Sequence, residues 1–153
     1  MSNSAVGMFG KKPIFVLELN ELDFHLAQRY AVKYGLNTLG KMTDPSVARR
    51  VISDAPYEKL EPWIQWPSVH TGKTYNEHQV FRLGDAVNYQ GRQLFEEIEG
   101  RGYSVGNLSA MNAANRMEKP AFFIPDPWTD TPSDSSFISR ALAQAVSQTV
   151  NDN

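Results

Sequence analysis

The chain has 153 residues, 41% of them apolar and 21% charged, with a net charge of −2. These values are typical of one globular domain and indicate neither a nucleic-acid nor a membrane-surface partner. The absence of cysteine excludes disulfides, thiolate chemistry and cysteine-based zinc sites. The first ten residues lack the pattern of a secretory signal, and no apolar run approaches the about 20 residues that span a bilayer, so we predict a cytoplasmic location.

The first 42 residues predict one strand followed by two helices. We expect residues 1–12 to be a loose tail, and the apolar run over 13–19 predicts a strand covered on both faces. Apolar side chains recur at helical spacing over 24–34, so a helix is expected there, with Asn20 as its N-cap. A short helix over 36–42 is expected next.

The pattern changes after that helix. Residues 46–52 alternate well enough for a second strand, and residues 54–84 are irregular and aromatic, with a short helix expected to begin at Pro67. The remaining expected elements are a helix over 91–100, strands over 103–108 and 121–124, a proline-rich loop over 125–133 and an amphipathic helix over 135–150.

This order of elements predicts the fold class α/β, a layered fold with a mostly parallel sheet. In such a fold the helix over 135–150 leads into another strand, and none follows it. We therefore expect residues 13–153 to be the N-terminal portion of an incomplete α/β domain. Its partner would be the missing C-terminal part of the same protein.

The first candidate site lies at the end of the predicted opening strand. Ligands bind beyond the carboxyl ends of strands in open α/β sheets, and strand alternation places Glu18 and Asn20 on the same face. Two oxygen-bearing side chains there are suited to a hard metal ion. The alternative is that Asn20 only caps a helix. Glu18 is harder to explain in that way, because a charged group inside an apolar strand requires a partner.

The second candidate site is the aromatic segment 61–78, which carries two of the three tryptophans and two of the three histidines. A helix start near Gln65 and Ser68 would present free N–H groups to an anion. His70 and His78 are candidates for metal ligands or acid–base groups, and the alternative for each is a hydrogen-bonded structural histidine. The tryptophans are expected to form the core or a pocket wall.

The third candidate is the proline-rich loop after the last predicted strand. Trp128 is suited to lining a pocket, and Asp126 and Asp130 are suited to binding a metal or sugar hydroxyls. A turn-forming role for both aspartates is equally consistent with the pattern.

Three segments taken together carry a resemblance to a known family. An apolar opening strand at 15–22 is followed by Thr71-Gly72 with His78 shortly after it, and then by a helix and strand over 91–108. In order and spacing, residues 13–125 resemble the alkaline phosphatase superfamily, particularly its phosphodiesterase and sulfatase-like branches. They are also similar to an uncharacterised bacterial branch associated with surface-polysaccharide genes, which indicates a glycan-linked substrate.

The resemblance implies a metal-dependent hydrolase or transferase that acts on a phosphate or sulfate ester, with Zn, Mn or Mg as its divalent metal. The chain departs from the family pattern in two places: Asn20-Glu21 replaces the usual Asp-Gly, and residues 62–65 offer no hydroxyl nucleophile. We therefore expect hydrolysis from a longer chain and not from this part alone. The implied roles are metal binding for Glu18, Asn20 and His78, catalysis for Gln65, Ser68 and His70, and substrate binding for Trp63, Trp66, Thr71, Asp126 and Trp128.

Two other functions are compatible with the sequence. A non-catalytic domain that binds an anion or a sugar would keep the scaffold without the missing nucleophile. A nucleotide-binding domain is disfavoured, because no glycine-rich phosphate loop appears. The metal-site hypothesis requires Glu18 and His70 to converge on a common hollow.

Overall fold

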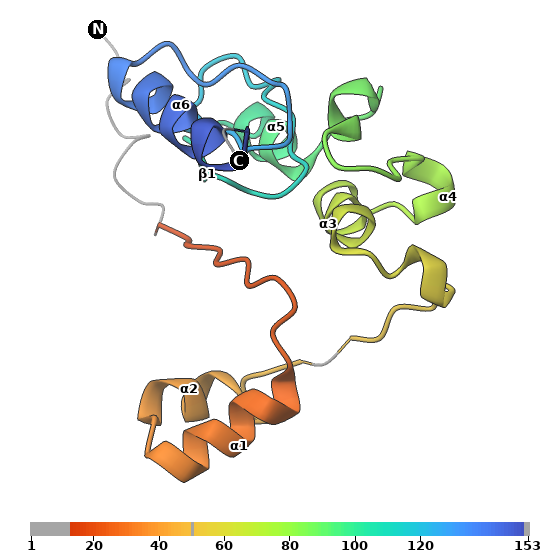
Figure 1. The fold of residues 1–153 in the computed structure, drawn as a ribbon, viewed down its shortest axis with the longest axis vertical. Coiled ribbons are helices and arrows are strands. Elements are labelled where there is room, and N and C mark those ends of the chain that lie inside the picture. The colour runs from red at the N-terminus through yellow and green to blue at the C-terminus, as the bar shows by residue number, and fades with distance from the viewer. Residues whose placement is uncertain (1–12, 50, 152–153) are drawn as a thin grey trace, which may run out of the picture.

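The computed structural model describes residues 13–49 and 51–151, so the predicted tail over 1–12 lies outside the described residues. Figure 1 shows the order of the elements along the chain. They are α1 (Phe24–Tyr34), α2 (Asn37–Met42), η1 (Tyr57–Lys59), α3 (Pro62–Thr71), α4 (Tyr75–His78), η2 (Asp85–Asn88), α5 (Leu94–Gly100), β1 (Gly106–Leu108), β2 (Phe122–Ile124) and α6 (Phe137–Asn151).

The sheet within the described residues consists of β1 and β2, which pair in parallel with Asn107 opposite Phe123. The predicted strands over 103–108 and 121–124 are confirmed, with shorter bounds. Helix α6 packs against β2, so helices and a parallel strand pair make this a mixed α/β structure.

The predicted strands over 13–19 and 46–52 are wrong. The described residues of both segments lack strand structure, and Ile14 and Phe15 are 83% and 92% exposed. A strand needs a neighbouring strand for its backbone hydrogen bonds, and an apolar strand also needs covered faces. No such neighbour pairs with either segment within the described residues.

Helices α1 and α2 form a hairpin that is joined to the rest by extended segments, as Figure 1 shows. Ala27 and Ala31 are buried on α1, which packs against α2. The N-cap of α1 is Asp23 and not Asn20, because the Asp23 carboxylate accepts the Leu26 N–H at 2.6 Å. The helix ends at Gly35 as predicted, and the left-handed φ of 64° there explains the glycine.

Helix α3 begins five residues earlier than the sequence indicates. Pro62 occupies its first turn, where a missing N–H costs nothing, and Pro67 lies inside the helix. The expected anion-binding helix start near Gln65 and Ser68 is therefore wrong, because these residues lie within α3. Gly72 ends the helix with a φ of 64°.

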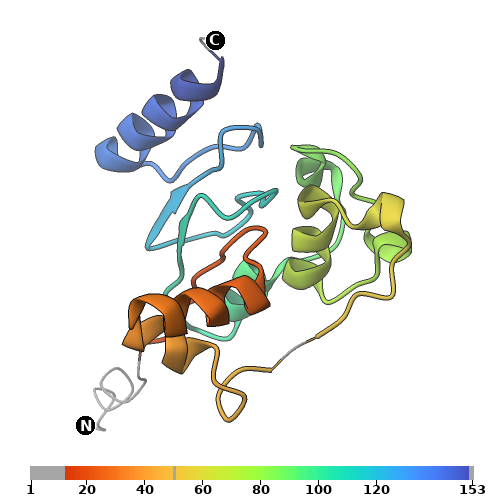
Figure 2. The ribbon, with the colours of Figure 1, turned by 60° about the horizontal axis from the view of Figure 1, so that its bottom comes forward.

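The apolar core is small and lies beside the sheet. Phe123 of β2 is fully buried and clusters with Ala113 and Met117, with Phe95 and Val105 packed against them. Figure 2 shows α6 on one side of the β1–β2 region and α3 on the other. The strand pair thus connects α6 to the part of the chain that carries α3 and α5.

A buried polar network centred on Asn112 extends this core. The side chain of Asn112 is 0% exposed and donates to the carbonyls of Trp63 at 2.8 Å and Arg82 at 2.9 Å. Its amide oxygen accepts the Ala86 N–H at 3.2 Å, and its own backbone N–H donates to Asp126 at 2.8 Å. One asparagine therefore joins α3, the η2 region and the loop after β2.

Candidate functional site

The candidate site forms where the opening segment crosses α3. The Nε2 atom of His70 lies 2.9 Å from the Oε1 atom of Glu18, although 52 residues separate them in sequence. The His70 side chain is fully buried and that of Glu18 is 22% exposed. The predicted convergence of Glu18 and His70 is confirmed, and the histidine is the partner that the charge of Glu18 required.

The orientation of the His70 ring is fixed from three directions. Trp66 stacks on it at a centroid distance of 6.0 Å, and Phe95 of α5 lies against it at 5.1 Å. Because an ionised carboxylate only accepts hydrogen bonds, Nε2 carries the proton that points at Glu18. The Nδ1 atom is buried and has no hydrogen-bond partner among the described residues.

A second contact joins the same two segments. The indole Nε1–H of Trp66 donates to the Oδ1 atom of Asn20 at 3.2 Å. Indole is a donor only, so the amide oxygen of Asn20 must face the ring. Asn20 therefore docks against α3, which explains why Asp23 replaces it as the helix cap.

Ser68 and His78 form a pair that resembles a nucleophile and its base, with Oγ and Nε2 2.9 Å apart. The Nδ1 atom of His78 accepts the Val80 N–H at 3.0 Å, so its lone pair is occupied and the proton resides on Nε2. The imidazole therefore donates to Ser68, whose hydroxyl donates onward to the Ile64 carbonyl at 3.4 Å. Burial lowers the pKa of His78, which favours this neutral tautomer. In this arrangement His78 cannot activate Ser68.

The other predicted residues of α3 bond to nearby backbone. Gln65 donates to the Lys59 carbonyl at 2.7 Å, and the Thr71 hydroxyl donates to the Pro67 carbonyl at 2.6 Å. Trp63 is half-buried, and its carbonyl accepts from Asn112. These contacts give Gln65 and Thr71 a role in shaping the ends of α3.

Asp126 and Trp128 belong to a different part of the molecule. The Asp126 carboxylate accepts from the backbone of Asn112 and Trp128, and from the Thr129 hydroxyl at 2.6 Å. Asp126 is 3% exposed, so these bonds make it the centre of a turn. Trp128 is 45% exposed, and Asp130 is also exposed.

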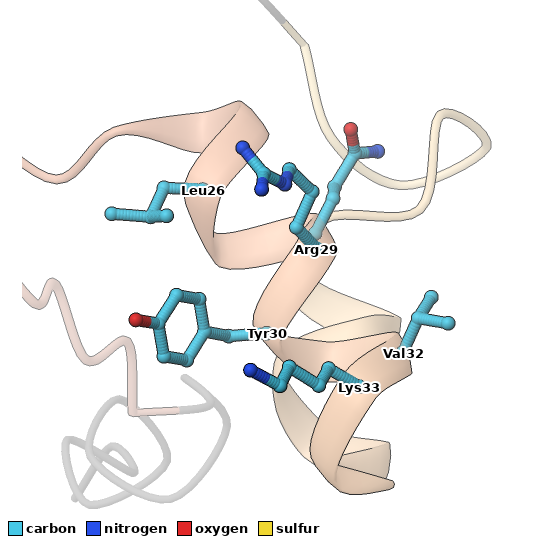
Figure 3. Close-up of a pocket in the computed structure, with 6 residues that line it drawn as sticks. Leu26, Arg29, Tyr30, Val32 and Lys33 are labelled. Carbon is cyan, nitrogen blue, oxygen red and sulfur yellow. The ribbon is translucent and has the colours of Figure 1, made fainter.

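The described surface concavities lie away from the Glu18–His70 pair. One, of about 570 Å³, lies beside α1, and Figure 3 shows Leu26 and Tyr30 pointing to the same side of that helix. Another, of about 510 Å³, lies beside α5 and includes Arg92 in its charged lining. The expected hollow shared by Glu18 and His70 is not among these two.

The sequence pattern did not identify several polar residues whose side chains hydrogen-bond to the backbone of other segments. Asn112 and Gln93 are fully buried, and Gln93 accepts the Ala114 N–H at 2.9 Å. Arg116 donates to the carbonyls of Ala86 and Gly91, both at 2.9 Å. Nothing in the local pattern distinguishes these polar side chains from exposed ones.

No group of three or more His, Asp or Glu side chains suited to a metal ion occurs within 13–49 and 51–151. In the same residues, the helices are too short or too polar to cross a membrane. Comparison of the chain with protein-family models, curated proteins and solved structures finds no match. The function is therefore inferred from the geometry of the site.

Proposed function

We propose that this chain is part of a metal-dependent hydrolase or transferase that acts on a phosphate or sulfate ester, within a layered α/β domain similar to alkaline phosphatases. The observation that supports this most is the buried His70, held by Glu18 at 2.9 Å with its second ring nitrogen unpartnered. The substrate class is a small-molecule or glycan ester.

A carboxylate behind a histidine has a defined chemical effect. It holds the ring in one tautomer and leaves the opposite nitrogen with its lone pair available to a reacting group. In this chain Glu18 plays that part, and Nδ1 of His70 is the nitrogen that exchanges the proton. The hydroxyl of Ser68 is engaged by His78 and Ile64, so water is the nucleophile that this arrangement favours.

The donor atoms near His70 fit a divalent metal. Glu18 and Asn20 offer oxygen atoms of the kind that hard divalent metals bind. These two residues are therefore the proposed ligands, whereas both nitrogens of His78 already have partners. A bound metal would polarise the ester oxygen and lower the pKa of bound water.

The test is turnover of an aryl phosphate and an aryl sulfate by the longer protein of which this chain is proposed to be a part, with Zn²⁺, Mn²⁺ or Mg²⁺ added, together with the metal content of that purified protein. We expect Glu18→Gln and His70→Gln each to lower turnover about 100-fold, because each disrupts the proton-exchanging pair. Matched controls are Glu58→Gln on η1 and His25→Gln on α1, which should retain it. Absence of turnover with all three metals would refute the proposal.

A second function is favoured by a different observation. Ser68 is already hydrogen-bonded to His78, so the site lacks a free hydroxyl nucleophile. A non-catalytic domain that binds an anion or a sugar would use the same contacts for recognition alone. Calorimetric binding of inorganic phosphate or sulfate that is lost in His70→Gln, without turnover, would support this second function over the first.

A further inference from the structure

Trp66 contacts both sides of the candidate site. Its ring stacks on His70 with an interplanar angle of 26°, and its Nε1–H donates to Asn20 of the opening segment at 3.2 Å. Trp66 and His70 are four residues apart on α3, so they lie on the same face of the helix. One indole therefore borders the histidine ring and also binds the segment that carries Glu18.

The distance between Glu18 and Asn20 along the opening segment can match the distance between His70 and Trp66 along α3. Glu18 and Asn20 are two residues apart in the opening segment, and a chain spans at most about 7 Å over two residues. Trp66 and His70 are four residues apart in a helix, which advances about 6.0 Å over four residues. The pairs Glu18–His70 and Asn20–Trp66 can therefore form together, and we call them the two-point clamp.

Apolar burial does not hold the opening segment in place. Residues 14–17 are 72–92% exposed, and Leu19, which lies between the two clamp residues, is 43% exposed. Directly after the clamp, Glu21 adopts a left-handed φ of 54° that turns the chain toward α1. The polar contacts of the clamp are thus the interactions that fix Glu18 opposite His70.

We propose that Trp66 is a positioning residue, and not a wall of the substrate pocket. Trp66 sets the ring plane of His70 and binds Asn20. The carboxylate of Glu18 then lies opposite Nε2, and Nδ1 remains as the reacting nitrogen. The positioning of His70 by Trp66 does not depend on the proposed function. The statement that Nδ1 of His70 reacts rests on that function. The geometry of the ring can be measured independently.

The direct test is the tautomer of His70, read from ¹⁵N-histidine NMR spectra of the whole chain at pH 8. The wild type should show the proton on Nε2. Trp66→Leu removes both the stacking and the N–H and should give a mixture of the two tautomers, whereas Trp66→Phe keeps a ring and should show a smaller change. Trp63→Phe on the same helix is the matched control and should leave the His70 signal unchanged.

A second variant keeps the test valid if Trp66→Leu does not fold. Asn20→Ala removes the acceptor of the indole without touching α3 and should also mix the tautomers, while Asn20→Asp retains an acceptor and should restore the wild-type signal. If His70 keeps one tautomer in folded Trp66→Leu, or in Asn20→Ala, the positioning role is overturned.

Kinetic measurements distinguish the positioning role of Trp66 from the proposed hydrolase function. With an active chain, Trp66→Leu should lower kcat about tenfold and change KM little, because the effect is on the alignment of a reacting group. A tenfold loss of kcat/KM that comes only from a higher KM would overturn the positioning role. A changed tautomer, together with no turnover in the longer protein of which this chain is proposed to be a part, would support the positioning role and refute the proposed hydrolase.

Discussion

At the scale of single residues, His78 is a buried titratable group with both ring nitrogens engaged. Val80 donates to Nδ1, and Ser68 accepts from Nε2, so the ring is held neutral. Burial is the main cause of its lowered pKa, and the nearby charge of Glu77 opposes the shift. Protonation would therefore break a backbone contact as well as place a charge in the interior.

This lowered pKa predicts how stability depends on pH. The unfolded chain binds a proton at His78 more readily than the folded chain, so the free energy of unfolding should fall as pH drops below about 6.5. His78→Gln should flatten this part of the pH dependence, because the titrating group is gone. Urea denaturation at pH 7.5 and 5.5 measures the effect.

The exposed Gln90, which does not titrate, provides the control for that measurement. Gln90→Ala should leave the difference between the two pH values as it is in the wild type. If His78→Gln shows the same difference as the wild type, titration of His78 does not contribute to stability in this range.

The sequence indicated that Glu18 needs a partner, because a carboxylate in an otherwise apolar run is costly without one. It did not identify His70 as that partner. Asn112 and Gln93 gave no such signal, because a buried asparagine or glutamine has the same local sequence context as an exposed one. Their burial follows from contacts with residues far away in sequence, such as Trp63 and Ala114.

At the scale of elements, the ends of α1 are set by local chemistry. Asp23 caps the first turn, and Gly35 takes the left-handed conformation that stops the helix. Only two residues of α1, Ala27 and Ala31, are buried. With so little packing, the cap should matter more to this helix than to a well-buried one.

Asp23→Ala should destabilise α1 by about 1 kcal/mol, because the Leu26 N–H loses its acceptor. Asp23→Asn and Asp23→Ser keep a capping oxygen and should retain most of the stability. Hydrogen exchange of the amides within 24–34 is the measurement. Equal exchange rates in Asp23→Ala and Asp23→Asn would show that the cap does not stabilise the helix.

Helices and strands differed in how well the sequence predicted them. The helices over 24–34, 91–100 and 135–150 follow from spacing and end signals, which act within the helix itself. Helix α3 was expected to start later, because Pro62 and Pro67 both suit a first turn and local pattern does not choose between them. The strands over 13–19 and 46–52 were predicted from apolar content, which does not specify a pairing neighbour.

At the scale of the whole molecule, several apolar side chains of the described residues are largely exposed. They lie mainly in the opening segment, where Phe15 is 92% exposed, and in 51–52. Exposed apolar surface of this kind binds small hydrophobic dyes and favours association.

The isolated chain should therefore increase the fluorescence of the dye ANS. Replacing Ile14, Phe15 and Leu17 together by Thr should lower that signal, because it removes most of the longest exposed apolar run. Tyr57→Thr, which removes one isolated exposed aromatic side chain, should change it little. An unaltered signal in the triple variant would mean that the opening segment is covered in solution.

The sequence by itself determined the positions of most helices, the end of α1 at Gly35 and the need of Glu18 for a partner. These features depend on backbone and side-chain chemistry within a few residues. Only the tertiary structure decided that His70 is that partner, that His78 is held neutral and that Trp66 binds Asn20. Each of these contacts joins atoms that are distant in sequence or fixes a proton on one ring nitrogen, and no local pattern encodes such a choice.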